Sequence, residues 1–531
     1  MKKNILYIPL LLLGLGVSSC GNWLDINTDP NASVKVSPGY LFNYSAVTWS
    51  GTRCGGDLYI PITTAAQVTS DGLFDGGWDS SNYIFDPYTA GNTWVGGYAN
   101  GLQNLDKAID FAKEEDNPNA IAQCKILQAE IYYSLTVMFG DIPYSQALLI
   151  EEYPTPAYDS QETVLNGIVS MLDEAIGLIK LDNNHRITDY DIYYKGDMEK
   201  WLRLAKSMKL RTLMLMVDKV PAKAAEMTSL LNEGQFLADE EDNFTFPYYN
   251  VAGTKNPNYA LLEQFYPGFP YDPICWPHKS AVEPMVAMND PRVPVMFSPD
   301  KDGNYIGLGT QEEAQLDDDL NALSTSMKPT FHVAITPDVL FSYEESEFML
   351  AEIYARGLGV TADLAKADEH YRNGVRAACA FVKVNEADIE TYVESLPELN
   401  TLTPEKALEA INIQVWIACM DRPLQAWTNQ RRSNVPALQV PSGANAPSLF
   451  ARFQYPDRKT PKALSLLQEI KPFFISFFPG FPSLRKTQIP LPKQIPPINR
   501  YANTPPTLAQ PGNHNEFPPF FAQIPHYNIS Q

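Results

Sequence analysis

Amphipathic helical patterns recur along most of this chain and constrain its fold more than any other feature. In the stretch YANGLQNLDKAIDFAKEED, apolar side chains return every three or four residues, at Leu102, Leu105, Ile109 and Ala112. This spacing gathers them on one face of a helix, and that face needs a partner to cover it. The same pattern returns in the segments 119–139, 160–179, 200–217, 343–355, 362–379 and 404–427. The sequence therefore predicts a mainly α-helical protein.

The predicted helices form pairs of tetratricopeptide-like length around 94–139, 160–217 and 343–380, without a strict repeat period. We therefore expect a degenerate helical-repeat scaffold. Two regions lack the pattern. Residues 48–93 are rich in Gly, Asp and aromatic residues, and residues 240–338 are rich in proline and aromatic residues. We expect loops with short helices in the first region and an ordered, loop-rich insert in the second, and loops on a rigid scaffold often carry function.

The N-terminus has the pattern of an export signal. Lys2 and Lys3 precede an apolar run from Ile5 to Val17, which is shorter than the roughly 20 residues that span a membrane. Two serines then lead to Cys20, and the sequence VSSC is similar to a bacterial lipobox. We expect residues 1–19 to be a lipoprotein signal peptide and Cys20 to carry the acyl chains that anchor the protein to a membrane. The alternative is a plain secretory signal followed by a coincidental cysteine.

Charge and composition exclude several classes of protein. The chain has 531 residues, of which 45% are hydrophobic, and 62 acidic against 40 basic side chains give a net charge of −22. Such an acidic surface repels phosphate backbones, so we expect no nucleic-acid partner. Six widely spread cysteines without a CxxC pair predict neither a disulfide framework nor a zinc site. We expect Cys124, Cys379 and Cys419 to be buried in helices, and a bridge between Cys54 and Cys275 stays open.

Signals of catalysis are weak. The sequence has no GxSxG, HExxH, phosphate-binding or dinucleotide-binding motif, so we expect no enzyme activity and no cofactor. Asp317, Asp318 and Asp319 are adjacent and lack the spacing of a calcium loop, so we expect no metal there. The predicted helix 343–355 carries four carboxylates that we interpret as a solvated face or as partners of Arg431 and Arg432, namely Glu344, Glu345, Glu347 and Glu352.

Aromatic residues in the two loop-rich regions are the strongest binding signal. Sugar rings have apolar faces that stack on aromatic side chains, whereas their hydroxyl groups bind Asp, Asn and Arg. The candidate ligand-binding residues are Trp78 and Tyr83 in the first region and Tyr266, Tyr271 and Trp276 in the second. A platform built from both regions suits a glycan, and the alternative is that these rings only pack the loops. By contrast, we expect Trp201, Leu204, Met208 and Leu210 to be core residues, and Lys209 and Arg211 to form ordinary ion pairs.

The C-terminal tail differs from the rest of the chain. Residues 459–531 contain 14 of the 43 prolines, no Asp, two Glu and seven Lys or Arg, so the tail is positive while the preceding part is negative. Proline-rich runs such as IPLPKQIPP favour extended backbone without a packed core. Two interpretations stay open, a disordered tail or a change of reading frame near Arg458.

Several sequence phrases together resemble one family. They are the lipobox at Cys20, LDINTDPN (24–31), GDIPYSQAL (140–148), EKWLRLAKSMKLR (199–211), FSYEESEFMLAEIYARG (341–357), QAWTNQRRSNVP (425–436) and FARFQYP (450–456). In this order, over residues 20–458, the chain resembles the SusD/RagB family of outer-membrane lipoproteins. It looks closest to the starch-binding-associated branch called SusD-like 2.

The resemblance implies a fold and a function. The fold is a tetratricopeptide-like helical scaffold with a loop-rich ligand-binding half. The function is capture of a nutrient glycan at the cell surface and its delivery to a SusC-like TonB-dependent outer-membrane transporter, with peptide capture as the alternative. Relatives usually end in a Trp-rich segment after a Tyr-Pro phrase, whereas this chain has no Trp after Trp427.

Overall fold

The structure is a computed structural model of the chain. It describes residues 36–70, 87–268, 276–309, 317–319, 321–328, 330–440 and 448–456. The chain divides into two units, Met1–Thr460 and Pro461–Gln531, and all described residues belong to the first unit. The predicted signal peptide, Cys20 and the tail 459–531 therefore lie outside the described residues, as do Trp78, Tyr83 and Tyr271.

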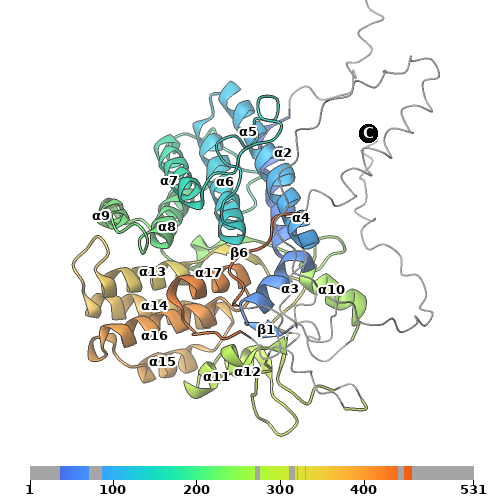
Figure 1. Cartoon of the computed structure of the whole chain (residues 1–531), viewed down its shortest axis with the longest axis vertical. Coiled ribbons are helices and arrows are strands. Elements are labelled where there is room, and N and C mark those ends of the chain that lie inside the picture. Colours follow the sequence, from blue (N-terminus) through green and yellow to red (C-terminus); the bar gives the residue numbers. More distant parts are fainter. Residues whose placement is uncertain are drawn as a thin grey trace, which may run out of the picture. The chain divides into compact units, whose positions relative to one another are not determined.

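Helices build the N-terminal part of the described chain, as the periodicity predicts (Figure 1). They are α2 (Pro38–Arg53), α3 (Gly56–Ala65), α4 (Pro87–Val95), the π-helix η2 (Gly96–Leu102), α5 (Gln103–Glu114), α6 (Pro118–Phe139), α7 (Gln161–Leu178), α8 (Met198–Met216) and α9 (Lys223–Glu233). From α5 to α8 each helix packs against the next, and α2 packs against α5. This arrangement of successive antiparallel neighbours is that of a helical repeat.

Local sequence signals fix the ends of these helices. In α6 the side chain of Asn117 accepts a hydrogen bond from the backbone nitrogen of Ala120 at 3.0 Å, and Pro118 occupies the first turn. Such a cap satisfies one of the backbone N–H groups that a helix start leaves unpaired. The helix stops at Gly140, whose φ of +79° is readily adopted only by glycine.

Helix α2 was missed by the sequence prediction, which expected loops and short helices over 48–93. The helix runs for 16 residues and buries Phe42, Ala46 and Trp49 completely. Its apolar pattern is weak because tyrosines and small polar residues alternate with the buried ones. Packing against α5 and η2 supplies the stability instead, as is usual for helices in proteins.

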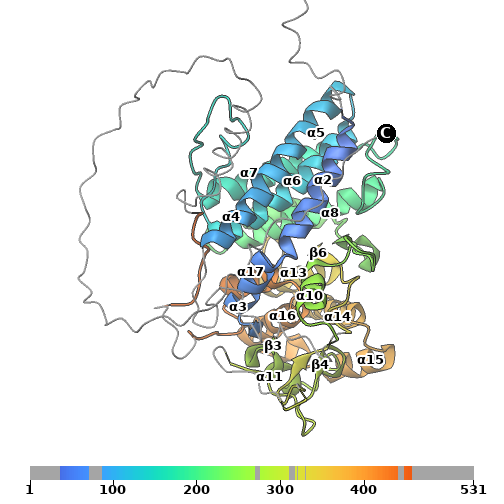
Figure 2. The same ribbon diagram turned by 90° about the vertical axis from the view of Figure 1, so that its right-hand side faces the viewer.

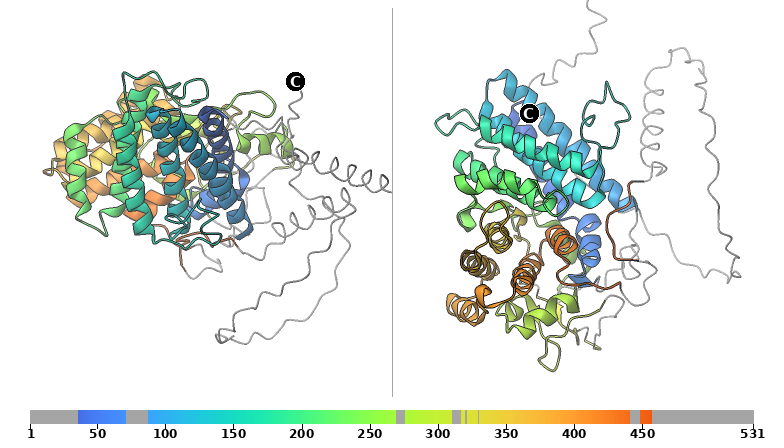
Figure 3. Two further views of the ribbon diagram at one scale, coloured as in Figure 1. Left: turned by 90° about the horizontal axis from the view of Figure 1, so that it is seen from above. Right: turned by 60° about the vertical axis from the view of Figure 1, so that its left-hand side comes forward.

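A second group of helices forms the C-terminal part. It contains α13 (Tyr343–Arg356), α14 (Leu364–Phe381), α15 (Glu386–Ser395), the short 3₁₀ turn η4 (Leu399–Thr401), α16 (Pro404–Ala418) and α17 (Pro423–Ser433). The predicted single helix 404–427 is wrong, because Pro423 has no N–H to continue the helical ladder and starts α17 instead. Figure 2 shows this group below the N-terminal helices, and Figure 3 shows its orange and yellow helices nearly end-on.

The middle of the chain is poor in long helices, as predicted. Its elements are the 3₁₀ turn η3 (Glu240–Asp242), β2 (Phe244–Phe246), α10 (Pro257–Phe265), β3 (Trp276–Pro277), α11 (Lys279–Ala287), α12 (Val293–Met296), β4 (Phe297–Ser298), β5 (Ser326–Met327) and β6 (Asp338–Phe341). Together with β1 (Thr69–Ser70), the described strands form three antiparallel pairs, β1–β3, β2–β6 and β4–β5. Each pair joins segments that are far apart in the sequence.

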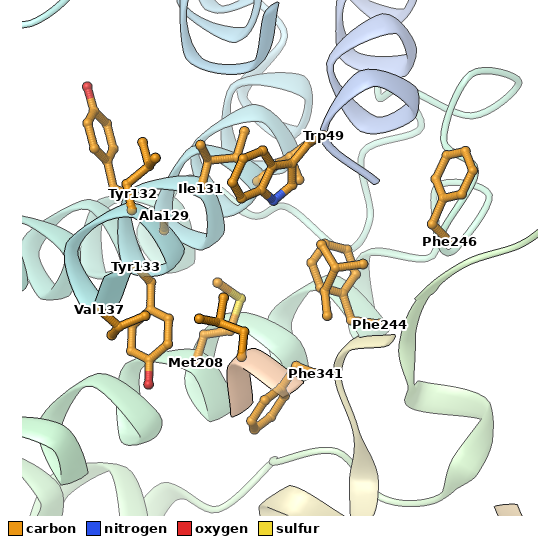
Figure 4. Packing of buried hydrophobic residues seen from close by; sticks show 14 of the residues in the cluster. Trp49, Ala129, Ile131, Tyr132, Tyr133, Val137, Met208, Phe244, Phe246 and Phe341 are labelled. Carbon is orange, nitrogen blue, oxygen red and sulfur yellow. The ribbon is translucent and has the colours of Figure 1, made fainter. Parts of the chain in front are cut away.

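One core joins the N-terminal helices to this insert. Figure 4 shows Trp49 beside Ile131 of α6, while Phe244 of β2 and Phe341 of β6 lie on the side toward Met208 of α8. The predicted core residues of α8 are confirmed, since Trp201, Leu204, Met208 and Leu210 are at most 1% exposed. The strand pair β2–β6 thereby fixes the insert to the helical scaffold.

The structure also tests the sequence predictions for the cysteines and for Lys209 and Arg211. Cys124, Cys379 and Cys419 are buried free thiols, as expected, and Cys54 is a buried free thiol as well, so it forms no bridge to Cys275. Lys209 pairs with Asp173 at 2.5 Å. Arg211 forms an ion pair with Glu130, and both side chains are buried, so this is not an ordinary surface ion pair.

None of the helices in the described ranges is long and apolar enough to cross a membrane.

Candidate ligand-binding site

The strand pair β1–β3 brings the two predicted aromatic regions to one place. Thr69 pairs with Pro277, and Ser70 pairs with Trp276. The first aromatic region, 71–86, begins directly after Ser70, and the segment 269–275 ends directly before Trp276. Two chain segments that are about 200 residues apart in sequence thus leave the same two-stranded stem. The structure does not describe segments 71–86 and 269–275, so a platform assembled from both regions stays a prediction.

The structure describes two of the five predicted ligand-binding residues, Tyr266 and Trp276. Trp78, Tyr83 and Tyr271 lie outside the described residues. Tyr266 follows α10 directly and is half-buried, and burial raises the pKa of its phenol. Trp276 is fully buried, so in this structure its indole offers no surface for stacking. Its strand pairs with Ser70 and places the ring inside the protein, which makes Trp276 a packing residue of the stem.

The base of the stem is held by polar contacts. The backbone nitrogen of His278 donates to Val68 O at 3.0 Å, and His278 forms a parallel bridge with Leu308. Its Nδ1 lies 2.9 Å from Ser280 Oγ, and that hydroxyl donates to the carbonyl of Gln67. Gln67 itself has a positive φ of 54°, which turns the chain from α3 into β1. These contacts fix where the first aromatic region starts.

A pocket lies between α3 and α10, the two helices that lead into the aromatic regions. Its free volume is about 40 Å³, enough for a few water molecules. Apolar walls come from Leu58, Tyr59 and Ile62 of α3 and from Leu424 of α17. Asn256, Asn258, Tyr259 and the segment 332–339 form the opposite side. We call this the α3–α10 pocket.

Asn256 positions the wall of the pocket formed by α10. Its Oδ1 accepts hydrogen bonds from the backbone nitrogens of Asn258 at 2.9 Å and Tyr259 at 3.3 Å, which caps the helix. Its Nδ2 donates to Thr336 O at 2.9 Å, and its own backbone nitrogen donates to Ala334 O at 2.9 Å. The helix start and the segment 332–339 are therefore one rigid unit. The sequence prediction missed these residues, although the phrase KNPN is a typical helix start.

The charged groups at the pocket are paired within the protein. Arg53 Nε lies 3.1 Å from Asp338 Oδ1, and both side chains are buried. Burial raises the pKa of Asp338, although Arg53 opposes this change. Arg422 lies 2.7 Å from Glu344 and 3.0 Å from Asp421. Since the two arginines and the two aspartates that line the pocket balance, the pocket has no net charge.

The four glutamates of α13 do not form a solvated face, so that expectation was wrong. All four are buried, the most exposed being Glu345 at 8%. Glu344 and Glu345 pair with Arg422, Glu347 with His370 at 3.0 Å, and Glu352 with Arg432 at 2.6 Å. The sequence pattern could not reveal this, because the apolar face of the helix is not its only buried face. These carboxylates hold helices together, and the predicted partnership with Arg432 is confirmed. The predicted partnership with Arg431 is wrong, because Arg431 donates to the backbone carbonyl groups of Ala451 and Val137 instead.

The described residues contain no preformed metal-binding site. No group of three or more His, Cys, Asp or Glu in the described ranges could hold a metal ion. The side chain of Asp317 instead accepts hydrogen bonds from the backbone nitrogens of Asp319 at 3.0 Å and Asn321 at 2.8 Å. Those backbone hydrogen bonds, with Asn321 first, lower the pKa of the Asp317 carboxyl. The aspartate cluster is thus a turn.

A body of paired helices with a loop-rich insert defines a class of helical-repeat proteins. A family model described as starch-binding associating with outer membrane, SusD-like 2, matches residues 58–456. The chain therefore belongs to the SusD-like family, as its sequence phrases indicate. No curated protein matches it.

Solved structures support the same fold. A SusD-like protein described as Bacteroidetes AC2a has a TM-score of 0.67 and 22% identity, covering 82% of this chain and 97% of its own. A chitin-binding protein has a TM-score of 0.66 and 21% identity, covering 83% and 96%. A SusD homologue from Bacteroides fragilis has a TM-score of 0.63 and 23% identity, also covering 83% and 96%. The whole described body is thus a SusD-like fold.

Proposed function

We propose that this protein is a non-catalytic, surface-exposed lipoprotein that captures a glycan and passes it to a SusC-like TonB-dependent transporter. The single observation that carries the proposal is the β1–β3 stem, which pairs Ser70, directly before the first aromatic segment, with Trp276, directly after the segment 269–275. Aromatic rings stack on sugar faces, and amide and hydroxyl groups bind sugar hydroxyls. Family membership supports a role at the outer membrane. The relatives named for starch and chitin binding support a glycan as ligand.

Titration calorimetry of the purified protein tests ligand capture. Suitable probes are maltoheptaose, a starch fragment, and chitohexaose, a chitin fragment. We expect binding of at least one probe at micromolar to millimolar strength without hydrolysis. Trp78→Ala and Tyr271→Ala should weaken binding and leave the thermal midpoint unchanged. Because Trp276 is fully buried, Trp276→Ala should lower the thermal midpoint instead.

Two outcomes contradict glycan capture. Binding of a casein peptide digest and of neither oligosaccharide assigns the protein to peptide capture. Release of reducing ends from either oligosaccharide, abolished by substitution of one carboxylate pair, assigns it to hydrolysis.

A pull-down from detergent-solubilised outer membranes tests the transporter partner, since the proposal requires a TonB-dependent barrel among the retained proteins.

Metabolic labelling with a palmitate analogue tests the anchor. We expect the label on the wild-type chain and its loss in Cys20→Ala, with release of that variant from the membrane fraction. The labelled protein should also be degraded by protease added to intact cells. An unlabelled chain in the soluble fraction contradicts the lipid anchor and surface position.

A further inference from the structure

Helix α2 carries a stripe of exposed apolar and aromatic side chains. Tyr40, Tyr44 and Val47 are 54%, 48% and 46% exposed. Their spacing of four and three residues places them on one face of the helix, opposite the face that buries Trp49. Large apolar side chains that gather on one exposed face commonly mark an interaction surface.

A tyrosine from another segment joins this stripe. Tyr190, in the connection between α7 and α8, packs on Tyr40 with 4.3 Å between the ring centroids. Asn43 Nδ2 donates to the carbonyl oxygen of Tyr190 at 3.2 Å, which fixes this connection to α2. Gly39 makes room for the ring, since a Cβ atom there would lie 2.7 Å from Tyr190 Cδ2. We call Tyr40, Tyr44 and Tyr190 the tyrosine platform.

The platform combines aromatic rings with hydroxyl groups. A hydrogen bond with Tyr40 raises the pKa of the Tyr190 phenol, so the two hydroxyl groups lie side by side. Residues 38–52 include no charged side chain, although 19% of the chain is charged. The exposed carboxylate of Asp189 adds an acceptor at the edge. This combination fits an uncharged ligand with apolar faces and many hydroxyl groups, whereas a lipid surface would have to desolvate the carboxylate.

The platform lies on the part of α2 that is remote from the β1–β3 stem. Helix α2 leads into α3 and then into β1, and Figure 1 shows α2 above both. The helix from Tyr40 to Arg53 is about 20 Å long at a rise of 1.5 Å per residue. A ligand that is bound at the stem therefore reaches the platform only if it is a long chain.

We infer that the tyrosine platform is a second glycan contact, on which a stretch of a polysaccharide chain stacks on Tyr40 and Tyr44 with its hydroxyl groups at Tyr190 and Asp189. This inference rests on the proposed capture of a glycan and adds the class of ligand, a polymer long enough to reach both surfaces. Two weak contacts with one chain strengthen each other, because the first creates a high local concentration for the second.

Affinity electrophoresis in gels that contain amylopectin or glycol chitin tests the platform. The double substitution Tyr40→Ala and Tyr44→Ala should lower the affinity for the retained polysaccharide by at least about tenfold, because the gain from two contacts is lost. Calorimetry with maltoheptaose and chitohexaose should show unchanged affinity for the short probe that the wild-type protein binds. Alanine is favourable in an exposed helix, so the thermal midpoint should stay near the wild-type value.

Tyr249→Ala is the matched control. It removes a ring of 53% exposure from the loop after β2, outside the platform, and should change neither polysaccharide retention nor binding of the short probe. An equal loss of retention in this variant and in the double variant contradicts a specific role of the platform.

The other outcomes separate this inference from the proposed function. If the double variant is retained by the polysaccharide as strongly as the wild-type protein, the platform is wrong and glycan capture stands. If it instead loses the TonB-dependent barrel from the pull-down, or binding to phosphatidylcholine vesicles, with polysaccharide retention unchanged, the surface is a protein or lipid contact and the inference is wrong. If the wild-type protein binds neither the polysaccharides nor the short probes, both conclusions fall.

Discussion

Arg432 holds Glu352 through two hydrogen bonds of 2.6 Å, from Nη1 to Oε1 and from Nη2 to Oε2. The pair joins α17 to α13 across 80 residues of sequence, with the Arg432 and Glu352 side chains only 13% and 5% exposed. Arg356 donates a further bond of 2.8 Å to Oε1. Such bidentate pairs combine charge with fixed geometry, so this contact sets how the two helices meet.

This pair predicts a pH-dependent stability. Burial alone would raise the pKa of Glu352, but the two arginines outweigh it and lower the pKa to about 2. A group whose folded pKa lies below its unfolded value stabilises the fold above the unfolded pKa, and this contribution is lost as the pH falls toward the folded value. Glu352→Gln should therefore lower the free energy of unfolding at pH 7 by about 3 to 5 kcal/mol. Urea unfolding should show the difference shrinking between about pH 5 and pH 2.

The exposed pair of Arg376 and Glu390 is the matched control. It has the same bidentate geometry, with bonds of 2.8 and 3.0 Å, but its side chains are 40% and 46% exposed. Glu390→Gln should lower the free energy of unfolding by less than about 1 kcal/mol. Equal effects of the two substitutions contradict the role of burial.

Arg431 should hold the last described segment of the chain. Its guanidinium lies 3.6 Å from the centre of the Trp427 ring and donates to Ala451 O at 2.6 Å and Val137 O at 2.7 Å. Arg431→Lys keeps the charge but loses the fork that reaches both carbonyls. Hydrogen exchange should then rise over residues 448–456 by about tenfold while α8 stays protected. Uniformly faster exchange across the protein contradicts this local role.

Asp159 should fasten the long connection between α6 and α7. Its carboxylate accepts bonds from the backbone nitrogens of Tyr144 at 3.0 Å and Ser145 at 2.7 Å, and from the Ser145 hydroxyl. Asp159→Ala removes all three, so limited proteolysis should cut near the exposed pair Leu149 and Ile150 several times faster. Glu151→Ala in the same connection is the control and should leave the cutting rate unchanged.

A comparison of Trp201 with Trp49 measures how much one buried hydrogen bond contributes to the free energy of unfolding. Both indoles are fully buried, but Trp201 Nε1 donates to Asp191 at 2.7 Å, whereas Trp49 Nε1 has no partner among the described residues. Trp201→Phe should therefore destabilise the protein by about 1 to 3 kcal/mol more than Trp49→Phe. Urea unfolding of both variants measures the difference, and equal losses contradict the assignment.

Local patterns explain what could be predicted. The spacing of Trp201, Leu204 and Met208 marks the buried face of α8, because helical periodicity is a property of neighbouring residues. The order of short phrases from residue 24 to residue 456 was enough to identify the family. Helix α2 escaped because its stability comes from packing partners rather than from its own pattern.

The sequence by itself determined the helical class, the family, the core of α8 and the two aromatic regions, since each is encoded in residues that lie close together along the chain. Only the tertiary structure decided that these regions leave one stem, that Trp276 is buried, and that Asn258 and Gln425 share a pocket. It also decided that the carboxylates of α13 are buried beside arginines from α17 and the turn before it. The physical reason is that burial, pairing of charges and hydrogen-bond satisfaction depend on contacts between residues that are 80 to 200 positions apart, and no local pattern records such contacts.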